Sequence, residues 1–208
     1  MPLSLAELQT RIERAYAAVN ATAIRGPILT FQNRPIFENG KLVALQAYSS
    51  RSFSAADTRN TAQTAIDNLA KLYDATIGWA KGGGIPESDV KAVTSNCLPL
   101  LVIRDLYNLD KHPDSGRTNI SKLQPGLTDV RIVLQSRPDQ PGSMFMDAVA
   151  GGGSTTTFEG FDLQLFGQVR NRITGEYIGS LQETLELGLR AWEEFLVSKG
   201  VISQSASP

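Results

Sequence analysis

The residues best suited to chemistry lie within one short stretch of the sequence, Leu101–Pro113. Arg104, Asn108 and Lys111 recur there at helical spacing, and His112, the single histidine of the chain, follows at once. At 100° per residue these four side chains share one side of a helix. The opposite side is an apolar stripe of Val102, Leu106 and Leu109. The pattern therefore predicts a core-facing helix with a compact polar patch on its back.

The patch is open to two readings, one chemical and one structural. Arg104 and Lys111 could hold an anion such as a phosphate, Asn108 could orient a ligand, and His112 could move a proton near neutral pH. Alternatively, Lys111 and His112 complement the negative end of the helix dipole before Pro113 ends the helix. Arg104 and Asn108 would then tie the helix to the following strands by hydrogen bonds. We expect the structural role first, ligand binding second and catalysis third.

The stretch RDLYNLDKHP resembles an Arg-Asp-x-x-Asn-x-x-Lys-His motif of poorly characterised bacterial α+β proteins. It is also distantly similar to the HEPN superfamily (higher eukaryotes and prokaryotes nucleotide-binding). That resemblance implies long helices that often dimerise, and a metal-independent ribonuclease site formed here by Arg104 and His112. The HEPN ribonuclease motif spaces its arginine and histidine more closely than this sequence does. The resemblance therefore implies a non-catalytic relative as well as a nuclease.

Composition excludes several other classes of protein. Lys and Arg number 20 against 21 Asp and Glu, so the basic excess typical of a general nucleic-acid binder is absent. With one cysteine, Cys97, and one histidine, the chain has no internal disulfide and no zinc-type ligand cluster. We predict no metal and no cofactor. The N-terminus lacks a signal-peptide pattern and no apolar run could span a bilayer, which predicts a cytoplasmic protein without membrane contact.

Three further features are interpreted as structural and not as functional. Cys97 sits among apolar residues and reads as a small buried hydrophobe. The glycine run 151–153 lacks the Gly-Lys-Ser/Thr ending of a phosphate loop, so it reads as a connection between strands. The carboxylate pairs of the last helix, Glu183/Glu186 and Glu193/Glu194, read as a solvated face.

The elements that must position the patch follow from periodicity and capping signals. Ser4 with Glu7 and Ser54 with Asp57 predict two helix starts. Asn39-Gly40 predicts a hairpin turn, with Pro35 making the first strand an edge strand or bending it. The second helix ends at the glycines 82–84, a short helix starts near Glu87, and a break at Asn96–Pro99 precedes the helix that carries the patch.

After Pro113 the sequence predicts short strands and a final helix over 176–199, with Ile178 on its apolar stripe. The whole is an α+β domain over residues 1–202 with a disordered tail, 203–208: long amphipathic helices packed with an antiparallel sheet, an N-terminal hairpin and a C-terminal helix. The predicted common core is Leu69, Tyr73, Val102, Leu106, Leu181, Leu185 and Trp192.

For function, the sequence favours an intracellular binding or interaction module without catalysis, which recognises a protein partner or itself. The first alternative is a HEPN-like ribonuclease or nucleotide-handling protein in bacterial defence, using Arg104, Asn108 and His112; only this alternative involves nucleic acid. The second is a phage- or virion-associated structural protein.

Overall fold

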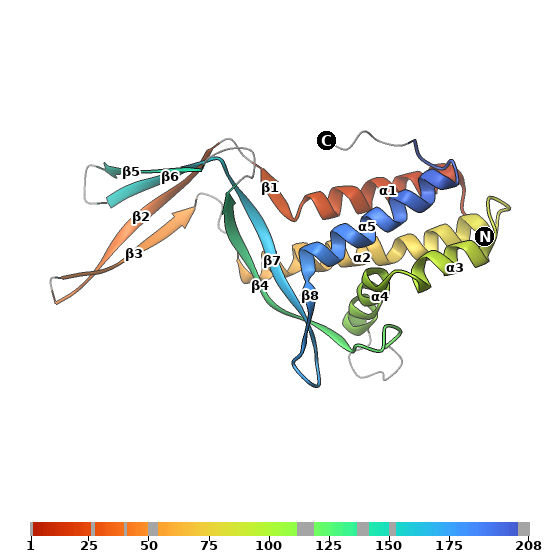
Figure 1. The fold of residues 1–208 in the computed structure, drawn as a ribbon. Helices are drawn as coiled ribbons and strands as arrows, with labels where there is room; N and C mark the ends of the chain where they lie inside the picture. Colours follow the sequence, from red (N-terminus) through yellow and green to blue (C-terminus); the bar gives the residue numbers. More distant parts are fainter. Residues whose placement is uncertain are drawn as a thin grey trace.

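The computed structural model describes residues 2–25, 28–39, 41–49, 54–111, 119–136, 142–149 and 153–203. These residues form helices and antiparallel strands, which confirms the α+β class (Figure 1). In chain order the elements are α1 (Leu5–Asn20), β1 (Ala23–Arg25), β2 (Ile28–Glu38), β3 (Lys41–Ser49), α2 (Ala55–Ala80), α3 (Glu87–Ser95), α4 (Leu98–Lys111), β4 (Pro125–Ser136), β5 (Ser143–Val149), β6 (Gly153–Glu159), β7 (Phe161–Asn171), β8 (Tyr177–Ser180) and α5 (Leu181–Ser198).

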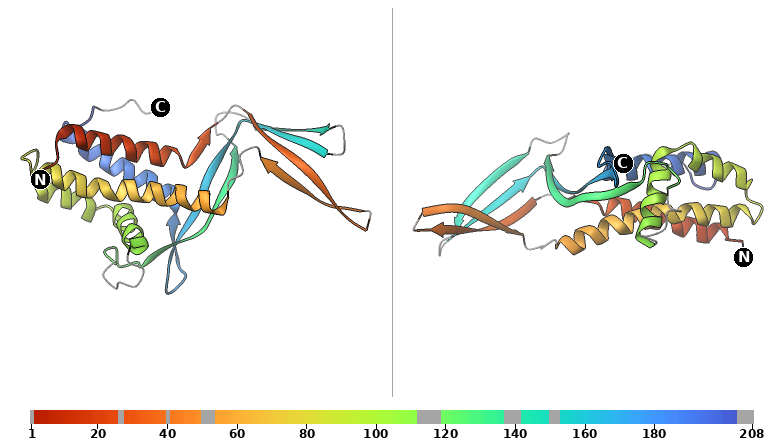
Figure 2. Two further views of the ribbon diagram at one scale, coloured as in Figure 1. Left: turned by 180° about the vertical axis from the view of Figure 1, so that it is seen from behind. Right: turned by 90° about the horizontal axis from the view of Figure 1, so that it is seen from below.

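The strands form two separate sheets. In the body sheet, β7 pairs along its length with β4, and its other edge pairs with β1 and then with β8. In the second sheet, which we call the arm sheet, the order is β3-β2-β6-β5. Figures 1 and 2 show helices α1 to α5 gathered at one end of the molecule and the arm sheet projecting from the other.

The helices and the body sheet share one hydrophobic core. Helices α2, α4 and α5 contact β4 and β7, and α1 packs along α2. The predicted core is confirmed, with one adjustment: Tyr73 is partly buried at its margin. The other predicted members are at most 5% exposed and belong to one cluster: Leu69, Val102, Leu106, Leu181, Leu185 and Trp192.

Local capping explains where the helices begin. Ser4 accepts a hydrogen bond from the Glu7 N–H, and the Glu7 carboxylate accepts one from the Ser4 N–H at 2.9 Å. Ser54 and Asp57 form the same box at the start of α2. Both predicted capping boxes are therefore confirmed. They satisfy backbone donors that the first helical turn leaves unpaired.

The predicted hairpin is also present. Glu38 pairs with Lys41, so residues 39 and 40 alone connect β2 to β3, and Asn39 has a positive φ of 51°. Of the two alternatives predicted from Pro35, an edge strand or a bend, the first is wrong for β2 as a whole, because β2 lies inside the arm sheet, although it holds locally at Pro35. Pro35 is tolerated there because β6 pairs only with Ile28–Asn33, which leaves β3 as the single neighbour of Pro35. The pairing then shifts just beyond it, between Ile36 and Phe37.

The prediction of a final helix over 176–199 is wrong at its start. Residues Tyr177–Ser180 form strand β8 on the edge of β7, and α5 begins only at Leu181. Ser180 caps the helix by accepting a hydrogen bond from the Glu183 N–H at 3.1 Å. Ile178 thus belongs to the body sheet and still packs against the core. Residues 204–208 of the predicted tail lie outside the described ranges.

Candidate functional site

The polar patch lies on α4, whose start is set by the predicted break. Helix α3 ends at Ser95, and α4 begins at Leu98 with Pro99 in its first turn, where a missing N–H is harmless. Arg104, Asn108 and Lys111 all lie on this helix. His112 lies outside the described residues, so its proposed dipole, ligand and catalytic roles stay predictions.

The guanidinium group of Arg104 lies over an aromatic ring from another helix. Its central carbon is 3.9 Å from the centroid of the Tyr73 ring on α2, and the residue is half-buried. Such cation–π contacts join elements, and arginine is well suited to them. The predicted hydrogen bonds from Arg104 to the following strands are therefore wrong within the described part of the chain. Arg104 ties α4 backwards to α2 instead.

A crevice beside Arg104 has about 160 Å³ of empty space, part of it open to solvent, and it leaves no room for a water molecule. Its walls come from α2, α3, α4 and α5. Two polar residues, Thr94 and Arg104, line it together with these apolar or aromatic side chains: Leu69, Ala70, Tyr73, Leu100, Ile103 and Trp192. A ligand pocket is normally several hundred cubic ångströms with convergent polar groups. In this state the crevice is a packing seam.

Lys111 is held within its own helix. Its ammonium group donates a hydrogen bond to the Tyr107 hydroxyl and lies 4.1 Å from the centroid of the same ring. That hydrogen bond is the main reason why the pKa of Lys111 is raised. Lys71 of α2 lies on the same ring at 5.8 Å and is paired with Asp67 at 3.3 Å. Lys71 and Lys111 therefore contact an aromatic ring, a hydroxyl group and a carboxylate of the protein itself.

Asn108 is half-buried, and among the described residues its side chain makes no hydrogen bond. The predicted tie to the following strands is therefore absent there, and the role in orienting a ligand stays a prediction. The patch as described thus brings Arg104, Asn108 and Lys111 onto one helix without converging them on a common point.

The residue that anchors α4 is Asp105, which the sequence reasoning missed. Its side chain is buried, with 1% of the residue exposed. Oδ1 accepts a hydrogen bond from the Ile120 N–H at 2.7 Å, and Oδ2 accepts two from Ser121, from the N–H at 2.8 Å and the hydroxyl at 2.6 Å. In the same loop, the side-chain oxygen of Asn119 accepts a hydrogen bond from the Gln124 N–H at 2.9 Å. A buried carboxylate is stable only when donors surround it, and this loop supplies them.

A signal for Asp105 is present in the sequence. Leu101 and Val102 precede it by four and three residues and Leu109 follows it by four, so it lies at the margin of the apolar stripe. A carboxylate there requires donors from another segment. The serine and asparagine of the segment 119–121 are suited to that purpose, although their distance along the chain hides the pairing.

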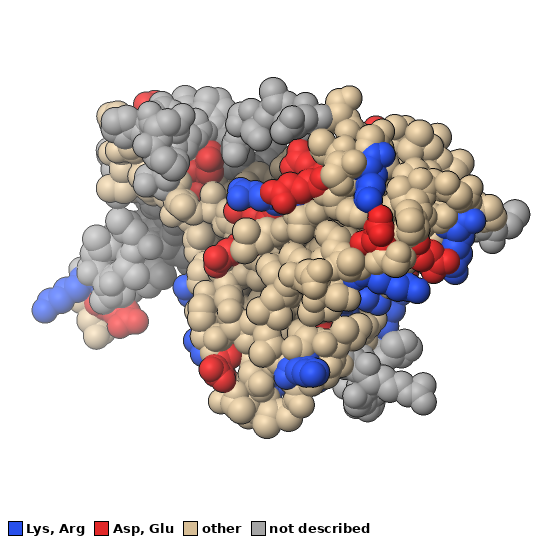
Figure 3. Space-filling model, turned by 45° about the vertical axis from the view of Figure 1, so that its right-hand side comes forward, with Lys and Arg blue, Asp and Glu red and all other residues tan. Residues whose placement is uncertain are grey.

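Other titratable groups do not assemble a second centre. Within the described residues no group of His, Cys, Asp and Glu could hold a metal ion. Glu183, Glu186 and Glu194 are exposed, as predicted for a solvated face, whereas Glu193 is half-buried against Tyr16 of α1. Burial, and then the charge of Glu193, raises the pKa of Tyr16 to about 12. Figure 3 shows acidic and basic residues interspersed on this side of the molecule, as its near-zero net charge implies.

Cys97 is a free thiol in the turn between α3 and α4. It is half-buried and packs against the core, so the predicted small buried hydrophobe is only partly buried. Gly84 lies near the end of α2 beneath the Trp79 ring, where an added Cβ would come within 2.5 Å of the ring.

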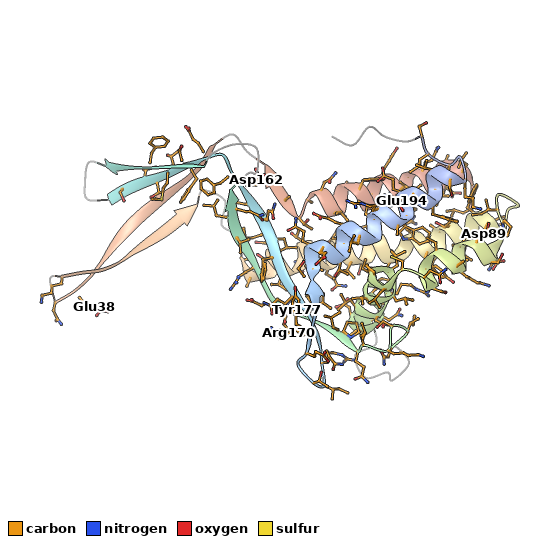
Figure 4. All side chains as sticks on the ribbon, in the orientation of Figure 1. Glu38, Asp89, Asp162, Arg170, Tyr177 and Glu194 are labelled. Atoms are coloured by element: carbon orange, nitrogen blue, oxygen red, sulfur yellow. The ribbon has the colours of Figure 1, made fainter. Side chains whose placement is uncertain are left out.

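The arm sheet is the second candidate site. Within the described ranges no helix packs extensively against it, and it meets the body sheet where β2 lies beside β7 and where Phe158 contacts Phe161. Met144 and Phe145 of β5 are 62% and 50% exposed. Figure 4 places Glu38 at the far tip of the arm and Asp162 at its junction with the body, whereas Asp89 and Glu194 lie on the helices. At the junction the rings of Phe158 and Phe161 meet edge to face, 5.6 Å apart.

None of the described helices is both long enough and apolar enough to cross a membrane. A scan of protein-family models, a search of curated proteins and a search of solved structures each found no match to this chain.

Proposed function

We propose that the protein is a non-enzymatic interaction module whose contact surface is the arm sheet, with the helical body as its support. The observation that carries the proposal is the isolation of that sheet from the helices. A sheet normally buries one face against another layer of the same domain. Among the described residues the projecting sheet of four strands has no such helical layer, so a partner molecule is the natural source of one. The phage- or virion-associated alternative is one form of this proposal.

The geometry of α4 supports a structural role for the polar patch. Arg104 is engaged by Tyr73 and Lys111 by Tyr107. The crevice beside Arg104 leaves no room for a water molecule, which also supports a structural role for this residue. The HEPN-like nuclease stays the alternative proposal, with Arg104 and His112 as its site.

A photo-crosslinking amino acid placed at position 144 tests the proposal, with the same group at Glu194 as the matched control. Both positions are exposed, one on the arm and the other on α5. In the cells that make the protein, we expect discrete crosslinked adducts from position 144 and none from position 194. Equal adducts from both positions, or none from position 144, would contradict the proposal. Metal-independent RNA cleavage that is lost in Arg104→Ala would restore the nuclease.

A further inference from the structure

The arm sheet continues the body sheet across the junction between them. Along the chain β2 follows β1, β7 follows β6 and β5 follows β4, and the strands stand in the same order in both sheets, β1-β7-β4 and β2-β6-β5. On the body side Arg25 pairs with Asp162, and on the arm side Ile28 pairs with Glu159. The step is three residues on each strand, so the two ladders keep one register. The junction therefore interrupts a single ribbon of strands.

A single residue, Gly160, stands between β6 and β7. Its φ is 72°, a left-handed conformation that an extended strand does not adopt and that glycine takes without steric cost. The central strand of the ribbon therefore turns at Gly160, and Figure 1 shows β6 leaving the line of β7. The other connections are longer: two residues from β1 to β2, five from β3 to α2 and six from β4 to β5. The shortest connection restricts the movement of the two sheets most, so it sets the position of a pivot.

The turn at Gly160 brings two aromatic rings together. In an extended strand, side chains three residues apart point to opposite faces and lie roughly 10 Å apart along the strand. The rings of Phe158 and Phe161 nevertheless meet edge to face, with their centroids 5.6 Å apart. Phe161 also packs on Gly142, where an added Cβ would lie 2.4 Å from the ring. Because the two phenylalanine rings meet only while the strand is turned, their contact stabilises the turned arrangement.

A straight arrangement is open to the same strands. Glycine takes negative and positive φ about equally readily, and a negative φ at Gly160 would join β6 and β7 into one strand. The ladder beside β1 and β2 would then continue in the register that both sheets already share. Residue 27 is a proline, which has no N–H to donate, so the straight arrangement gains little pairing there. It loses one aromatic contact in exchange, which keeps the two arrangements close in free energy.

We infer that Gly160 is a hinge with two settings. In the turned setting, which the structure shows, Phe158 rests on Phe161; in the straight setting β6 and β7 form one strand. The hinge swings the arm sheet relative to the helical body while each sheet keeps its own pairing. A partner that binds the two settings unequally shifts their populations and so selects the direction of the arm. This inference concerns the direction of the arm and does not depend on what the arm binds.

Distances between two spin labels test the hinge in the full chain. Glu38→Cys places one label at the far tip of the arm and Glu194→Cys places the other on α5, in a Cys97→Ala background that removes the native thiol. Both glutamates are exposed. Double electron–electron resonance in frozen solution should show two distance populations for this pair. Labels at Arg59 of α2 and Glu194, which are both exposed residues of the body, should show one.

Alanine variants at two glycines of the same backbone conformation locate the pivot. Gly160→Ala should lower the ratio of turned to straight molecules by about 5- to 30-fold, which is the cost of a left-handed backbone to an L-residue. Gly175, between β7 and β8, has a φ of 74°, and no described atom lies within 4 Å of an added Cβ. Gly175→Ala therefore carries the same backbone cost and should leave the ratio unchanged. Phe158→Leu should lower the ratio by about 2- to 12-fold through loss of the aromatic contact.

The outcomes separate the hinge from a fixed junction. A single narrow population for positions 38 and 194 in the parent protein, unmoved by Phe158→Leu, would overturn the hinge, and this comparison decides the question even if Gly160→Ala does not fold. Two populations whose ratio changes equally in Gly160→Ala and Gly175→Ala would overturn Gly160 as the pivot. Crosslinking from position 144 tests the contact surface separately, so a failure of the hinge and a failure of the proposed function are distinguishable.

Discussion

Ser121 donates both its backbone N–H and its hydroxyl to Oδ2 of the buried Asp105, at 2.8 and 2.6 Å. Because Ile120 binds the other carboxylate oxygen, one side chain of α4 holds the backbone of the segment that leads into β4. The helix that carries the polar patch is thereby fixed to the body sheet. Asp105 therefore connects α4 to the segment before β4, and neither Arg104 nor Asn108 makes this connection.

Asp105→Ala is expected to lower the free energy of unfolding by about 3 kcal/mol, because it removes charge-assisted hydrogen bonds and leaves their donors without a partner. Denaturant unfolding measures the change. Asp110→Ala on the same helix is the control, because Asp110 is exposed and its loss should stay within about 0.5 kcal/mol. Equal effects of the two substitutions would show that Asp105 is not an anchor.

The sequence could indicate where α4 lies but not what holds it. The break before Pro99 and the spacing of Val102 and Leu106 are local signals, and both were sufficient. The partners of Asp105 come 15 and 16 residues later, beyond the reach of helical periodicity. Similarly, no residue close to Arg104 in the sequence indicates that its guanidinium group contacts the Tyr73 ring on α2.

Arg104→Ala is expected to destabilise the protein by about 0.5–2 kcal/mol through loss of the contact with the Tyr73 ring. Arg104→Lys should recover only part of this, because an ammonium group does not stack as a guanidinium group does. A double-mutant cycle with Tyr73→Leu isolates the pairwise energy. Asn108→Ala, which removes no described hydrogen bond, should change stability by less than about 0.5 kcal/mol. A loss in Asn108→Ala as large as that in Arg104→Ala would contradict these assignments.

Two glycines within helices should respond in opposite directions. Gly78 of α2 has room for a methyl group, since an added Cβ would meet only Leu3 at 3.5 Å, so Gly78→Ala should stabilise by about 0.5–1 kcal/mol. Gly188 of α5 faces Ile103, Leu100 and Leu69 at 2.6, 3.2 and 3.3 Å, so Gly188→Val should destabilise by at least about 1–3 kcal/mol. Melting temperatures of the two variants give the signs. A stabilised Gly188→Val would show that α5 does not approach α4 as closely as described.

Tyr16 should make stability depend on pH in the alkaline range. Its pKa is raised from 10.0 to about 12, so the folded state keeps the proton after the unfolded chain has lost it. The stabilisation is complete below pH 10 and is lost as the pH rises through about 12. Ultraviolet titration should therefore show a late component that belongs to Tyr16. That component should vanish in Tyr16→Phe and persist in Tyr177→Phe. Absence of a late component in the parent protein would contradict the burial of Tyr16.

The fold itself was predictable wherever its signals are local. Capping boxes, the Asn39 turn and the apolar stripes needed only neighbouring residues. The pairing of β2 with β6, which joins Ile28 to Glu159, depends on segments far apart in the chain, so the separate arm sheet could not be foreseen. Strand β8 was mistaken for helix because Ile178 happens to continue the helical spacing of α5.

Crosslinking from the arm is the most direct measurement of the interaction surface. Met144 lies on β5 and is 62% exposed, and Glu194 is an exposed residue of α5. With a photo-crosslinking amino acid at position 144, the account predicts discrete adducts in the cells that make the protein, and none when the same group stands at position 194. No adduct from position 144, or equal adducts from both positions, would contradict the arm sheet as the contact surface.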